Sequence, residues 1–149
     1  MLSAAGCLFL IVLLLACQSD LRLRWISDAF PAFLAAAGLL FTALTGGWPF
    51  LGYTLAGALA VFLLGLLAFR YGILGGADVK LLSAAALWLQ PAQLLVFLQV
   101  TALAGGVLAL VYLLLARLRG ESAGSVKLPY AVAIAAGGLA VTPSLAGWL

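Results

Sequence analysis

The chain has 149 residues, of which 67% are hydrophobic and 7% are charged, and its formal net charge is +3. A water-soluble domain carries about 25% charged residues, so the composition excludes a soluble globule and indicates an integral membrane protein. Histidine is absent, which excludes a Ser-His-Asp triad, a histidine-ligated zinc ion and a histidine proton shuttle.

Uncharged stretches divide the sequence into six candidate transmembrane helices. One crossing needs about 20 apolar residues, and two of the stretches are long enough to cross twice. Each of these two has a Gly/Pro turn inside it, at residues 45–49 and 90–91. The predicted spans cover residues 2–18, 29–45, 50–69, 73–90, 92–116 and 128–148. The predicted fold is all-α and polytopic, with residues 1–149 forming one membrane-embedded domain and no soluble domain.

The first predicted span is expected to be retained rather than cleaved, because it lacks the basic n-region of a signal peptide. It contains the two cysteines, Cys7 and Cys17. On one helix they would lie about 15 Å apart, too far to bridge each other. We interpret them as packing residues, with lipidation of one cysteine as the alternative.

All eleven charged residues fall at or beside three of the junctions between predicted spans. They are Asp20, Arg22, Arg24 and Asp28, then Arg70, Asp78 and Lys80, then Arg117, Arg119, Glu121 and Lys127. With six spans, every charge lies on one side of the membrane. The positive-inside rule makes that side cytoplasmic and places both chain termini outside, with Trp48 and Trp148 at the outer interface.

Asp20 and Asp78 are predicted to lie at similar depth on the cytoplasmic side. Ionisable residues at the edge of the hydrocarbon are costly and usually functional. Two adjacent carboxyl groups can share one proton, so that one activates water while the other protonates a leaving amine. The alternative is that both aspartates cap helices. The sequence leaves both interpretations open and predicts no metal and no cofactor.

The residues around the aspartates have a structural and a functional interpretation each. Gly72, Gly75 and Gly76 precede Asp78 and either let an extended substrate approach or form a plain turn. A phosphate-binding loop is not expected there, because no strand is predicted before it and no serine or threonine directly follows Lys80.

The basic residues near the aspartates either contact substrate or lipid headgroups or only signal topology. They are Arg22, Arg24, Arg70 and Lys80. Lys80 is two residues from Asp78, so it points to another helix face and is given no catalytic part. Pro129 suits a first helical turn, and Tyr130 either lines the cleft or lies in the interfacial belt.

Three stretches carry a resemblance to a known family. Residues 20–28 read Asp-Leu-Arg-Leu-Arg-Trp-Ile-Ser-Asp, residues 75–82 read Gly-Gly-Ala-Asp-Val-Lys-Leu-Leu, and residues 127–133 read Lys-Leu-Pro-Tyr-Ala-Val-Ala. In order and spacing they resemble the motifs of type IV prepilin peptidases, the bacterial branch of the GxGD membrane aspartyl proteases. The short chain looks like the stand-alone peptidases of tight-adherence or Flp pili.

The resemblance implies that Asp20 and Asp78 are catalytic aspartates of an endopeptidase in the bacterial inner membrane. The implied partner is a prepilin or pseudopilin precursor, with a basic leader before a hydrophobic helix that lies in the lipid bilayer. No nucleic-acid partner is expected, and the sequence gives no expectation for the oligomeric state.

This sequence departs from the family pattern at several positions. Ala77 replaces the second motif glycine, and Ser27 and Asp28 replace Pro-Asn. The first loop has no room for the Cys-x-x-Cys insertion of larger members, so peptidase activity without N-methylation is expected. Two other functions stay open: a small transporter or proton-coupled carrier, and an inactive pilus-assembly subunit.

Overall fold

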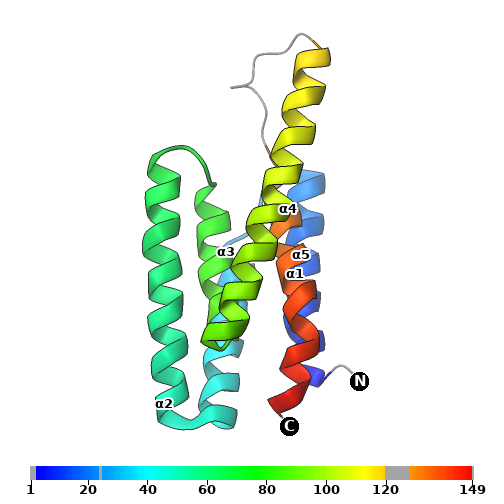
Figure 1. The fold of residues 1–149 in the computed structure, drawn as a ribbon. Coiled ribbons are helices and arrows are strands. Elements are labelled where there is room, and N and C mark those ends of the chain that lie inside the picture. Colours follow the sequence, from blue (N-terminus) through cyan, green and yellow to red (C-terminus); the bar gives the residue numbers. More distant parts are fainter. Residues whose placement is uncertain (1–2, 24, 120–127, 149) are drawn as a thin grey trace.

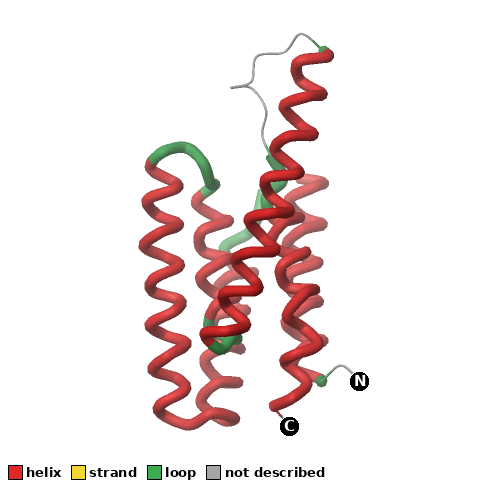
Figure 2. Tube along the Cα trace, viewed as in Figure 1, coloured by secondary structure: helices red, strands yellow, loops and turns green. Residues whose placement is uncertain are grey.

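The computed structural model describes residues 3–23, 25–119 and 128–148, and every regular element in these ranges is a helix (Figure 2). The elements in chain order are α1 (Ala4–Leu23), α2 (Ala29–Arg70), α3 (Gly76–Ala86), α4 (Pro91–Leu118), α5 (Ala131–Val141) and the 3₁₀ helix η2 (Thr142–Trp148). Successive segments run up and down along one direction, and the two termini lie at the same end (Figure 1). The all-α prediction is therefore confirmed.

The long helix α2 reverses direction at Gly47 and forms two antiparallel arms (Figure 1). Gly47 has φ 67°, a left-handed conformation that glycine adopts at little cost, and Pro49 follows it. The reversal falls within the turn predicted at residues 45–49. Trp48, at this turn, is 86% exposed.

Within the described residues, three helices, α1, α2 and α4, are long and apolar enough to cross a membrane, and Ala131–Leu145 is a shorter apolar helix. Large apolar side chains cover the outer faces of α2 and α4; among them Leu64, Leu110 and Leu113 are exposed. Small residues such as Gly38, Ala58, Gly65 and Gly105 face inward and are buried. This arrangement is that of a membrane protein, in which small residues let helices approach closely and apolar residues face lipid.

The helix α3 is shorter than the span predicted at residues 73–90. It has 11 residues and is about 16 Å long, roughly half of the hydrocarbon thickness. The difference has two causes. The chain turns at Gly72, where φ is 70°, and Gly75 is extended, so that α3 starts only at Gly76.

The α2 turn and the connection from α3 to α4 both point toward the end of the bundle that holds the termini. The α3–α4 connection does not extend as far toward that end as the α2 turn does (Figure 1). Its polar groups are satisfied locally. The backbone N–H groups of Leu87, Trp88 and Leu89 donate to carbonyls three residues earlier. Gln90 and Gln93 form a capping box at the start of α4, and Gln93 Nε2 donates to Ser144 Oγ over 3.0 Å. Buried backbone at membrane depth needs this self-sufficiency.

The core is centred on Trp88, which is 1% exposed. The indole Nε1–H donates to the Leu34 carbonyl over 2.8 Å. Its ring stacks on Phe41, with centroids 5.3 Å apart, and packs at an angle against Phe9 at 5.5 Å. Gly38 faces the indole edge, where a Cβ would come within 2.7 Å of the ring. These contacts fasten the C-terminal end of α3 to α1 and to the first arm of α2.

Candidate active site

A cavity of about 400 Å³ is lined by both predicted catalytic aspartates. Asp20 comes from the last turns of α1, and Asp78 comes from the first turn of α3. The remaining lining is contributed by Ile26, residues 72–77, Leu128 and Tyr130. Residues separated by 58 positions thus contribute carboxyl groups to one hollow.

Asp78 is the more enclosed of the two carboxyl groups. It follows the extended N-cap residue Gly75 and is 9% exposed. The helix α3 is not among the helices long enough to cross a membrane. Asp78 lies in its first turn, at the end that carries the charged residues. The backbone of Gly75 forms a hydrogen bond with the carboxyl group, as in the backward half of a capping box. Among the described residues, the buried Oδ1 atom of Asp78 has no hydrogen-bond partner.

Burial and the neighbouring charge of Asp20 raise the pKa of Asp78 to about 6, while the hydrogen bond from the Gly75 backbone acts in the opposite direction. Removing a carboxylate from water and placing it beside another acid both favour its neutral form. Asp78 therefore holds a proton more readily than an ordinary aspartate.

Asp20 connects α1 to the start of α5. Its Oδ2 accepts a hydrogen bond from the backbone N–H of Ala131, the first residue of α5, over 3.4 Å. The N-terminal ends of α3 and α5 are thus both at the cavity, and helix N-termini favour negative charge nearby. The helix-cap interpretation and the acid–base interpretation both describe part of the geometry, because each carboxyl group contacts one helix N-terminus.

Tyr130 forms one wall of the cavity. It is half-buried, and its burial together with the charge of Asp78 raises the pKa of its hydroxyl group. The ring lies against Gly105 of α4, where a Cβ would come within 2.7 Å of the phenol. Of the two positions open for Tyr130, the structure gives the one that lines the cleft.

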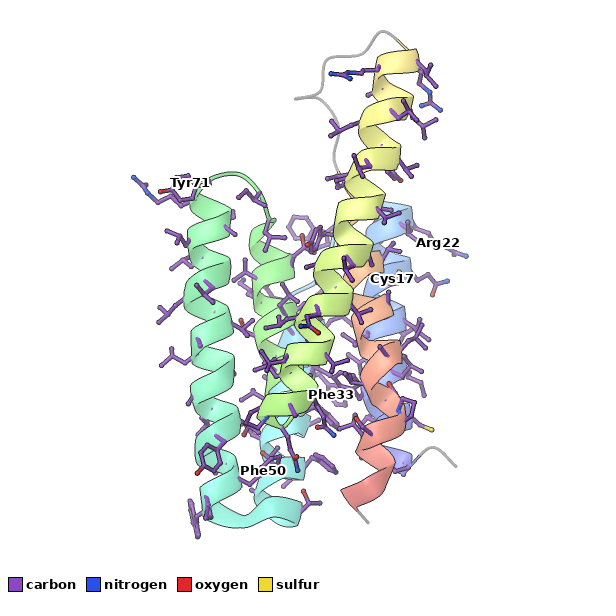
Figure 3. All side chains as sticks on the ribbon, in the orientation of Figure 1. Cys17, Arg22, Phe33, Phe50 and Tyr71 are labelled. Atoms are coloured by element: carbon purple, nitrogen blue, oxygen red, sulfur yellow. The ribbon has the colours of Figure 1, made fainter. Side chains whose placement is uncertain are left out.

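The other predicted residues divide into two groups. Gly75, Gly76 and Ala77 line the cavity beside Asp78. Lys80 points elsewhere: its Nζ donates to Asp28 Oδ1 over 2.8 Å, as expected from its offset to Asp78. Arg22 is exposed and projects from the end of α1 (Figure 3). Arg24 lies outside the described residues.

Pro129, which the sequence indicates as a motif residue, is buried but is not part of the lining. Other residues of this part of the molecule were not predicted from the sequence. Ile26 and Leu128 do line the cavity, and neither carries a chemical signal in the sequence. Ile26 reaches it after a turn that Ser19 Oγ closes by donating to the Trp25 carbonyl over 2.7 Å.

Within residues 3–23, 25–119 and 128–148, no group of three or more His, Cys, Asp or Glu side chains could hold a metal ion. Cys7 and Cys17 are free thiols. Among the described residues that line the cavity, the titratable side chains are those of Asp20, Asp78 and Tyr130.

The fold and the cavity together define a class of protein: a helical membrane protein with two aspartates in one cavity near one end of the bundle. The model of the type IV leader peptidase family matches residues 7–110. This is more than half of the chain, so the protein belongs to the type IV leader peptidase family, and the resemblance seen in the sequence is confirmed. The matched region contains both aspartates and ends before Tyr130.

Family membership makes the protein a leader-peptidase-like protease of the membrane. No curated protein and no solved structure matches the chain.

Proposed function

We propose that this protein is a membrane aspartyl endopeptidase that removes the leader peptide of prepilin-like precursors at the cytoplasmic face of the inner membrane. The observation that carries the proposal is that Asp20 and Asp78 line one cavity. Neither residue is close to the other in sequence, and an arrangement serving only helix capping would not require a shared hollow of about 400 Å³.

In this mechanism the pair of carboxyl groups carries one proton. The ionised member removes a proton from a water molecule, whose oxygen attacks the carbonyl carbon of the scissile bond. The neutral member donates its proton to the carbonyl oxygen. The tetrahedral intermediate then collapses, the C–N bond breaks, and the amine leaves with a proton from the pair.

The raised pKa of Asp78 supports Asp78 as the proton carrier and Asp20 as the base. Asp20 accepts the N–H of Ala131 at the positive end of α5, and this contact stabilises its ionised form. Because the two groups interact, their titration belongs to the pair.

The proposed topology has the charged end of the bundle in the cytoplasm and both termini outside. It is supported by the alternating direction of the helices and by the two termini lying at one end (Figure 1). The described residues between α1 and α2 are few, which supports peptidase activity without N-methyltransferase activity. Reporter fusions near Gly47 and after Leu149 should read outside, and one near Ser122 should read inside.

The decisive experiment replaces each carboxyl group by an amide. Asp20→Asn and Asp78→Asn should each abolish cleavage of a co-expressed precursor that has a basic leader before an apolar helix. The matched control is Asp28→Asn, because Asp28 pairs with Lys80 outside the cavity, and this variant should still cleave. Full cleavage by either cavity variant, with normal amounts in the membrane, would rule out the two-carboxylate mechanism.

A further inference from the structure

A second cavity of about 260 Å³ lies beside the one that holds the aspartates. Apolar side chains from three helices form most of its lining, including Val61 and Ala68 of α2, Leu82 of α3, and Leu98 and Ala102 of α4. Two residues, Leu74 and Tyr130, line both cavities. They form a shared wall between a compartment with two acids and an apolar compartment.

The shared wall is held in place by a contact with α4. The Tyr130 phenol lies in a notch that exists because residue 105 is glycine: a Cβ there would be 2.6 Å from the hydroxyl oxygen and 2.7 Å from two ring carbons. The neighbouring Gly106 has nothing within 4 Å of its Cβ position. The Tyr130 ring can therefore occupy this position only because residue 105 has no Cβ atom.

The apolar cavity also borders the outer surface of the bundle. Leu64, which belongs to its lining, is exposed among the apolar side chains of α2. An apolar helix in the bilayer can therefore reach this cavity from the side without crossing a polar surface. The aspartate cavity next to it offers carboxyl groups and the backbone of residues 72–76 instead.

We propose that the apolar cavity is the specificity pocket for the substrate residue that follows the cleaved bond, and that Tyr130 and Leu74 separate this pocket from the carboxyl groups. The inference rests on the proposed peptidase function. A peptide bond held at the carboxyl pair has a polar leader on one side and an apolar helix on the other. Successive residues of an extended chain advance about 3.3 Å, so the first apolar side chain falls within reach of the adjoining cavity.

The first test uses a matched pair of glycine variants in α4. Gly105→Ala pushes the Tyr130 ring out of its notch, and Gly106→Ala adds the same methyl group where nothing is displaced. Cleavage is measured on co-expressed precursors with Ala, Leu or Phe after the cut. A hydrophobic pocket discriminates between two substrates by about 10-fold or more for each methylene group by which they differ. Gly105→Ala should change the ratio of Phe to Ala cleavage by that amount, and Gly106→Ala should leave it unchanged.

A second pair of variants places a larger side chain in the pocket, one from α4 and one from α2. Ala102→Leu and Ala68→Leu should each lower kcat/KM for the Phe precursor by about 10-fold or more while retaining cleavage of the Ala precursor. These variants keep the inference testable if Gly105→Ala does not accumulate in the membrane.

The outcomes separate the two proposals. If the unmodified protein cleaves none of the precursors, the proposed function fails. If it cleaves them and the three pocket variants Gly105→Ala, Ala102→Leu and Ala68→Leu keep its ratio of Phe to Ala cleavage, the peptidase function stands and the specificity pocket is refuted.

Discussion

The two ends of α3 lie in contrasting surroundings. At its C-terminal end Trp88 is enclosed by Phe9, Phe41 and Leu34, with its one polar hydrogen bonded. At its N-terminal end Asp78 faces a cavity, and its Oδ1 atom has no partner among the described residues. A short helix that is firmly packed at one end can hold an unfavourable acid at the other. Sites that store such a cost persist where the surrounding structure fixes them.

The largest expected effect comes from loosening the packed end. Trp88→Ala removes a fully buried indole and should lower the free energy of unfolding in detergent by about 3–5 kcal/mol. Trp48→Ala is the matched control, because Trp48 is 86% exposed at the α2 turn, and its effect should be within about 0.5 kcal/mol. Equal losses in the two variants would contradict the contrast between the ends of α3.

The next effect concerns the acid at the open end. The pKa of Asp78 is raised from 3.8 to about 6 in the folded protein. Between these values the folded state binds more protons than the unfolded state, so stability falls as the pH rises through this window. Asp78→Asn removes this cost and should stabilise the protein by about 3 kcal/mol above pH 6.

Thermal unfolding in detergent across pH measures this gain, which should shrink toward zero below about pH 4. Asp28→Asn serves as the comparison, since Asp28 is exposed. An Asp78→Asn variant that is less stable than the parent at pH 8 would show that the acid at the cavity carries no such cost.

A smaller effect tests the tight packing of Gly38 against the edge of the Trp88 indole. Gly38→Ala places a Cβ within 2.7 Å of Trp88, and overpacking of this kind costs about 1–3 kcal/mol. Gly52→Ala, also in α2, meets nothing within 4 Å and should be neutral or stabilising by about 0.5–1 kcal/mol. Unfolding of the two variants in detergent gives the difference directly, and a Gly38→Ala protein as stable as Gly52→Ala would contradict the tight fit at Trp88.

The smallest effect is expected at the ion pair between Lys80 and Asp28, whose side chains are 51% and 74% exposed. Exposed pairs contribute about 0.2–1 kcal/mol. A double-mutant cycle with Lys80→Ala and Asp28→Ala should give a coupling energy in this range that weakens in high salt. A coupling of several kcal/mol would mean that this contact, rather than Trp88, fixes α3.

The sequence predicts the helical fold and the proximity of Asp20 and Asp78. Both follow from the order of apolar stretches and charged residues along the chain. Charge segregation puts both aspartates at one end of the bundle whatever the details of packing. The turn at Gly47 is also predictable, since glycine followed by proline breaks a helix. The predicted residues 75–77 line the cavity because they are joined to Asp78 by the backbone.

Other features depend on contacts between distant residues and leave no periodic signal. The start of α3 depends on the backbone conformations of Gly72 and Gly75, which hydropathy does not report, so the sequence overestimates the length of this helix. The pairing of Lys80 with Asp28 spans 52 positions. The contact of Tyr130 with Gly105 looks, in the sequence, like an interfacial tyrosine and one more small residue in an apolar helix.

The position of Trp88 has a consequence for the membrane itself. Asp78 precedes it by ten residues, and Asp20 follows Phe9 by eleven, so the aromatic layer lies about 15 Å below both acids along their helices. A water-accessible cavity on one side of a bilayer conducts no protons as long as no continuous chain of water molecules connects it to the other side. In the proposed topology, the packed rings of Phe9, Phe41 and Trp88 would interrupt any chain of water between the cavity and the opposite face.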